Sequence, residues 1–103
     1  MDKIEIINRL VDVMTKLDNL GVFYGNNYDG KWHEKYPHSC YWLEIRLDKH
    51  RGGFESLIAD GCRDTRTELS VGIGNSATEM LLDLLENTYN DIVKDLGSSE
   101  NVV

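Results

Sequence analysis

Residues 41–48 alternate strictly between two faces, and this pattern constrains the fold more than any other. The apolar positions are Tyr41, Leu43, Ile45 and Leu47, and between them stand Trp42, Glu44, Arg46 and Asp48. A period of two is typical of a β-strand with one buried face. The turn sequences KHRGG and DGCRDT each lead into a further strand pattern, at Phe54–Asp60 and Arg66–Ile73. Three strands joined by short turns predict an antiparallel meander.

The register of this meander is predicted by keeping one sheet face apolar, because a slip of one residue turns a whole strand over. In the first hairpin, pairing Ile45 with Leu57 and Leu43 with Ala59 meets that condition. These four side chains are therefore expected on the face that the helices cover.

One helix is predicted before the meander in the chain and another after it. The first spans Asp2–Leu20, where Asp2 and Glu5 resemble a capping box and Gly21 ends the helix. Its buried stripe is predicted from apolar residues at helical spacing: Ile4, Ile7, Val11, Met14 and Leu17, with Leu10 beside them.

The second helix is predicted over Ser76–Leu96, with a capping box at Ser76 and Glu79 and Gly97 as its terminator. Its predicted buried residues are Leu81, Leu82, Leu85, Tyr89, Ile92, Val93 and Leu96.

Together these elements predict a two-layer α+β domain of order α-β-β-β-α, an antiparallel three-stranded meander with two helices on one face. A short strand at Val22–Tyr24 would make the sheet four-stranded. A chain of 103 residues has the size of one domain. We assign residues 1–97 to that domain, residues 23–40 to an aromatic-rich loop within it, and residues 98–103 to a disordered tail.

The net charge of −7 is concentrated in the last third of the chain. Residues 1–66 carry 11 acidic and 10 basic side chains, whereas residues 67–103 carry seven acidic side chains and one basic. Nucleic acid and anionic membranes need basic clusters, so a basic protein is the better partner. Glu79, Asp83 and Glu86 would form an acidic ridge on the second helix, spaced like a row of phosphates. The alternative is an ordinary solvated helix face.

The segment Phe23–Trp42 holds seven of the nine aromatic residues. Four of them recur every four residues: Tyr24, Tyr28, Trp32 and Tyr36. Aromatic side chains on a loop favour contact with a protein partner, while packing over the core is the alternative. Trp42 and Ile58 are expected on the outer sheet face, where an exposed tryptophan would suit a partner or a second copy.

His33, His38, Cys40 and Cys62 form a weak candidate zinc site, since two imidazoles and two thiolates can bind zinc tetrahedrally. Their spacing matches no zinc-finger pattern. In a reducing cytosol the two cysteines are expected as thiols, and on oxidation they could pair across the strands.

No catalytic or cofactor-binding motif is present, so an enzyme is not predicted. The first residues lack a signal peptide, which favours a cytoplasmic location. We therefore predict a small acidic protein-binding module, an inhibitor that occludes a basic, nucleic-acid-facing surface of its partner. Toxin immunity proteins and phage anti-defence proteins share this size and charge, by analogy and not by motif. A ligand-binding or zinc domain and a homo-oligomeric structural protein are the alternatives.

Overall fold

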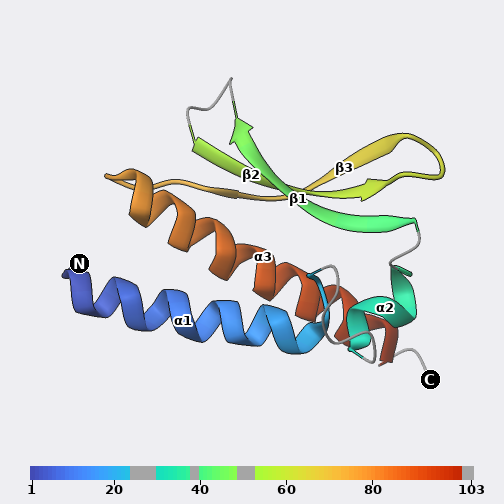
Figure 1. Ribbon diagram of the computed structural model, residues 1–103, viewed down its shortest axis with the longest axis horizontal. Helices are drawn as coiled ribbons and strands as arrows, with labels where there is room; N and C mark the ends of the chain where they lie inside the picture. Colours follow the sequence, from blue (N-terminus) through green and yellow to red (C-terminus); the bar gives the residue numbers. More distant parts are fainter. Residues whose placement is uncertain (24–29, 38–39, 49–52, 101–103) are drawn as a thin grey trace.

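The computed structural model describes residues 1–23, 30–37, 40–48 and 53–100 (Figure 1). Its elements in chain order are α1 (Lys3–Leu20), α2 (Lys31–Lys35), β1 (Tyr41–Asp48), β2 (Gly53–Asp60), β3 (Thr65–Gly72) and α3 (Ala77–Glu100). The strands pair antiparallel in the order β1-β2-β3. The predicted α+β fold is confirmed, and each strand lies within one residue of its predicted bounds.

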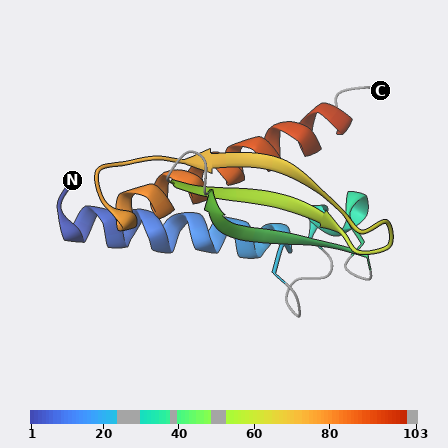
Figure 2. The same cartoon turned by 90° about the horizontal axis from the view of Figure 1, so that it is seen from above.

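All three helices lie on one side of the sheet, as predicted for the two long ones (Figure 1). Of these, α3 packs against β3 and β2, and α1 packs against α3. Seen from above, α1 runs on the β1 side of the molecule and α3 on the β3 side (Figure 2). The first helix therefore joins the rest of the domain mainly through α3.

Local chemistry fixes the two ends of α1 as predicted. The Asp2 carboxylate accepts a hydrogen bond from the Glu5 backbone N–H at 2.8 Å, which satisfies one of the donors that a helix start leaves unpaired. Gly21 ends the helix with φ of 84°, a left-handed conformation that glycine adopts without steric cost.

The predicted buried stripe of α1 is wrong for four of its five residues. Val13 and Leu17 are buried, whereas Ile4, Ile7, Val11 and Met14 are exposed. The two sets are neighbouring apolar arcs on one helix, and together they span about half of its circumference. Only the arc containing Val13 and Leu17 faces α3.

Helix α3 is buried on two sides because it lies between α1 and the sheet. The sequence pattern identified Leu82, Leu85, Ile92 and Leu96 correctly, all of them buried, but it was wrong for Val93, which is 39% exposed. It missed a second apolar side that includes Leu84, which is 0% exposed. The helix also continues through Gly97 to Glu100, so the predicted end at Gly97 is wrong.

The contact between α3 and the sheet is close and partly polar. A Cβ on Gly72 would lie 2.3 Å from the carbonyl oxygen of Met80 and 2.5 Å from Cβ of Leu84, so only glycine fits at this crossing. Further along, the hydroxyls of Ser56 and Thr88 are hydrogen-bonded at 2.8 Å, and both residues are 0% exposed. Each buried hydroxyl thus obtains its partner from the other layer.

The predicted strand register is wrong by one residue. Leu43 pairs with Ile58 and Ile45 pairs with Ser56, which places Ile58 on the helix side and Leu57 on the outer face. A shift in the β2–β3 register between Ser56 and Leu57 adds an irregularity of the kind made by a β-bulge. Keeping one sheet face apolar did not give the correct register, because β2 is the central strand and is buried on both faces. Its apolar residues therefore do not identify the face that the helices cover.

A short helix occupies part of the segment that was predicted as a loop. Helix α2 carries Trp32, which is 1% exposed and packs in the same core cluster as Val13, Leu17 and Leu82. In the part of the chain that the structure describes, the sheet has three strands, and Val22 and Phe23 belong to none of them.

Candidate functional site

The most unusual surface feature is a row of exposed apolar side chains along α1. Ile4 is 73% exposed, Ile7 58%, Val11 62% and Met14 41%. We call these four residues the α1 stripe. Single exposed apolar residues are common, but several in one row on one helix mark a contact surface.

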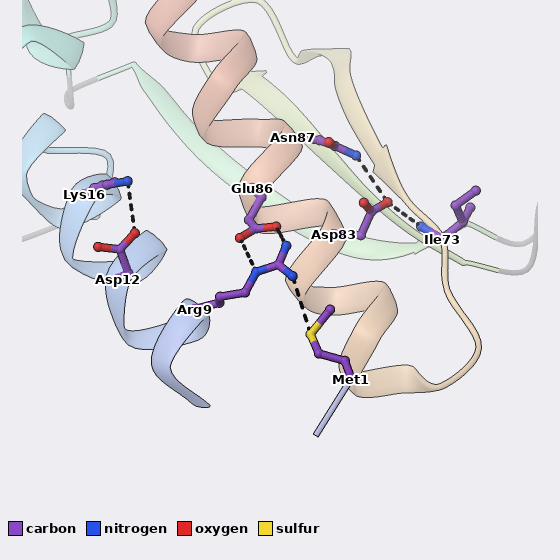
Figure 3. A network of polar contacts seen from close by, with 8 residues as sticks. All are labelled: Met1, Arg9, Asp12, Lys16, Ile73, Asp83, Glu86 and Asn87. Carbon is purple, nitrogen blue, oxygen red and sulfur yellow. Dashed lines mark hydrogen bonds and ion pairs between the residues drawn. The ribbon is translucent and has the colours of Figure 1, made fainter. Parts of the chain in front are cut away.

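The stripe faces outward because α1 packs on α3 through its other apolar arc, which contains Val13 and Leu17. Arg9 forms an ion pair with Glu86 of α3, with its Nε donating to Glu86 at 3.0 Å (Figure 3). This hydrogen bond raises the pKa of Arg9. Lys16 pairs with Asp12 at 3.0 Å one turn away. Arg9 and the buried arc of α1 thus contact α3, and the stripe is left to solvent.

A hollow lies at the C-terminal end of the stripe. Its volume is about 360 Å³, and it is lined by Met14, Thr15, Asp18 and Phe23. The hollow is open to solvent, and the described residues that line it include two apolar ones, Met14 and Phe23. It can accept an apolar side chain from outside.

The helix-facing side of β1 adds to the exposed apolar area. Ile45 is 41% exposed and Leu47 68%, although they share a sheet face with Leu43 and with Ser56, which α3 contacts. Because α3 packs on β3 and β2, the second half of β1 extends past its cover.

The predicted acidic ridge on α3 is largely occupied by contacts within the chain. Glu86 pairs with Arg9, and the Asp83 carboxylate accepts hydrogen bonds from Ile73 N–H at 3.0 Å and from Asn87 at 3.2 Å (Figure 3). Within the described residues, the Glu79 side chain takes part in no hydrogen bond or ion pair. Only one of the three acids therefore projects without such a contact.

The predicted aromatic contact residues separate into three groups. Trp32 is buried, so it packs in the core and offers no contact surface, as the packing alternative expects. Tyr36 stacks on it with ring centroids 4.5 Å apart and donates to Asp95 at 3.1 Å. Tyr24 and Tyr28 lie outside the described residues.

Trp42 lies on the outer sheet face, as predicted, and is 38% exposed. Its ring covers Gly61, and its N–H donates to Glu44 at 2.9 Å. Glu44 also accepts from Arg66 at 2.9 Å, and these two hydrogen bonds lower the pKa of Glu44, Arg66 having the larger effect. Ile58, expected beside Trp42, lies on the opposite face. Trp42 therefore lies beside a hydrogen-bonded pair of charged residues, Glu44 and Arg66.

Cys40 and Cys62 form a disulfide with a Cα–Cα distance of 5.5 Å. This is the cross-strand pairing predicted for oxidising conditions, in place of two thiols. It connects the residue before β1 to the turn after β2. The bond occupies both sulfur ligands of the candidate zinc site, His38 lies outside the described residues, and no described group of three or more ligand side chains could hold a metal ion.

The chain matches no protein-family model, no curated protein and no solved structure. Of the described helices, none combines the length and apolar character needed to cross a membrane.

Proposed function

We propose that this chain is a small acidic protein-binding module that contacts protein through the α1 stripe. The supporting observation is the exposure of four apolar side chains in one row on a helix that packs on α3 through a different arc, with Val13 and Leu17. Burying exposed aliphatic surface releases about 25 cal/mol per Å², which makes such a row the natural anchor of an interface.

The charge distribution supports a more specific form of this proposal, an inhibitor of a basic partner. Residues 67–103 carry a net charge of −6, from seven acids and Lys94. Long-range attraction of that kind accelerates encounter with a basic protein, and a bound acidic domain would occlude a nucleic-acid-facing surface. Asp83 and Glu86 are engaged in contacts within the chain, so they do not form a free phosphate-like ridge. This form of the proposal is therefore based on electrostatic steering by the whole acidic region.

The test is a pull-down of the tagged chain from nuclease-treated lysate of its native host, with mass spectrometry of the captured proteins. The informative variant is Val11→Asp, which puts a charge in the centre of the stripe at a position that is 62% exposed. Its matched control is Asn90→Asp, the same added charge at an exposed position of α3. We expect a stoichiometric partner with the native chain and the control, and its loss with Val11→Asp.

Capture that is equal in all three proteins would overturn the assignment to the stripe. Capture of no partner at all by the native chain would overturn the proposal of a module that binds another protein. If the partner is basic, raising the salt concentration from about 0.05 to 0.5 M should slow association markedly, because a shorter Debye length screens the steering charges.

A further inference from the structure

We propose that the α1 stripe is the contact between two copies of this chain, with their first helices packed antiparallel. The inference rests on the proposed function in that it uses the same surface, and it names a second copy as the occupant.

The spacing of the stripe is self-complementary. Its residues stand at positions 4, 7, 11 and 14, separated by three, four and three residues, and this spacing is the same in both directions. An antiparallel copy therefore places Ile4 opposite Met14 and Ile7 opposite Val11. A two-fold interface requires such reciprocity, because each residue must meet a partner that it meets again across the axis. Alternation of three and four is also the narrow seam of paired helices.

The hollow at the end of the stripe lies where this pairing needs it. Met14 lines the hollow, and in the antiparallel arrangement Ile4 of the second copy lies opposite Met14. Ile4 is 73% exposed, so its side chain can enter the hollow without rearranging its own copy. The two-fold axis makes this insertion happen twice.

Charge favours a second copy over a charged partner at this particular surface. Helix α1 contains three basic and three acidic residues, so two copies of it do not repel each other: Lys3, Arg9 and Lys16, and Glu5, Asp12 and Asp18. The next positions on the far flank of the stripe are Asn8 and Thr15, both uncharged. The net charge of −6 in residues 67–103 lies elsewhere in the sequence. A chain with net charge −7 can thus self-associate here without a strong like-charge penalty.

The size of a stable interface indicates that the contact extends beyond α1. Specific interfaces bury about 800 Å² on each partner, more than four aliphatic side chains can supply. Two further exposed apolar side chains, Ile45 and Leu47, stand on β1, on the helix-facing side of the sheet.

The first experiment is sedimentation velocity of the purified chain over a range of concentrations. We expect a species of twice the 11.8 kDa chain mass. For Val11→Asp we expect the dissociation constant of the dimer to rise at least about 100-fold, since dimerisation would bury a new charge from each copy. Asn90→Asp should behave as the native chain, and circular dichroism of all three proteins checks that folding is retained. A native chain that stays at monomer mass at high concentration overturns the inference.

The second experiment tests the antiparallel direction with single cysteines and a short thiol cross-linker. A mixture of Ile4→Cys and Met14→Cys chains should cross-link to each other. Neither variant should cross-link to itself, because in an antiparallel pair the same position on the two copies is separated by ten helical residues, about 15 Å. Cross-linking of each variant with itself would indicate a parallel pair and overturn the geometry.

The two proposals can fail separately. A monomer that captures a host protein in a Val11-dependent way removes the second copy and keeps the binding function. A dimer that captures no other protein removes the inhibitor and keeps the second copy.

Discussion

At the scale of single residues, the stability of the domain depends on polar groups that find partners in another layer. Ser56 and Thr88 are the clearest case, because each is 0% exposed and each has the other as its hydroxyl partner. The hydrogen bond itself contributes modestly to stability, but an unpaired buried hydroxyl is costly.

We therefore predict that Thr88→Val destabilises the chain by about 1–3 kcal/mol, because it keeps the shape of the side chain and leaves Ser56 without its partner. The double variant Ser56→Ala/Thr88→Val should lose less than the sum of the two single variants. Urea unfolding of the four proteins measures this difference. Strict additivity of the two single effects would show that the hydroxyls do not act as a pair.

At the scale of elements, α2 is held to α3 by a polar contact as well as by Trp32. Lys35 donates to Asp95 at 2.7 Å, and Tyr36 donates to the same carboxylate. These contacts, the Lys35 hydrogen bond first, lower the pKa of Asp95. The pKa of Lys35 is raised in turn, chiefly by its hydrogen bond to Asp95.

The sign of the pH dependence follows from that direction. A carboxyl group whose pKa is lowered by folding stabilises the folded state above its unfolded pKa of about 4, and this contribution is lost as the pH falls through the folded value. Asp95→Asn should therefore reduce stability at pH 7 and make little difference at pH 2–3. We expect a few tenths of a kcal/mol, since the side chains of Lys35 and Asp95 are 40% and 45% exposed.

Unfolding in urea at both pH values tests this, with Glu34→Gln on α2, next to Lys35, as the control. An Asp95→Asn effect that is unchanged or larger in acid would contradict it.

Sequence patterns predicted where the helices and strands lie in the chain better than they predicted how these elements pack against one another. The strands and α1 were predicted within one residue, because alternation, capping residues and turn residues are local signals. The register and the α1 stripe were not predicted, because β2 is apolar on both faces and α1 is apolar over two arcs. Both β2 and α1 carry apolar residues on more than one side. The pattern of apolar residues alone therefore could not show which side faces the rest of the domain.

The candidate site was missed for the same reason. The sequence directed attention to Trp32, which fills the core, and to Asp83 and Glu86, which serve internal contacts. Ile7 and Val11 were assigned to the core because nothing local distinguishes an apolar residue that packs inside its own chain from one that packs against another molecule.

At the scale of the whole molecule, the disulfide closes a loop that includes β1 and β2. Cys40 and Cys62 are 22 residues apart, and a cross-link of that length restricts the unfolded chain enough to contribute about 3 kcal/mol. Replacing both cysteines by serine, or adding reductant, should lower the free energy of unfolding by up to that amount.

Denaturant unfolding with and without reductant measures the effect, and the double serine variant should no longer respond to reductant. A native chain insensitive to reductant under conditions that reduce the bond would contradict the stabilising role.

The attachment of α1 mainly through α3 has a dynamic consequence. A helix that packs on one side only can unfold locally without disturbing the sheet. The amide hydrogens of α1 should therefore exchange with solvent through local unfolding, whereas those of β2 should exchange only through global unfolding. Any molecule that covers the stripe would close that route. The exchange protection of one helix then becomes a measure of occupancy, readable in the native protein without a label.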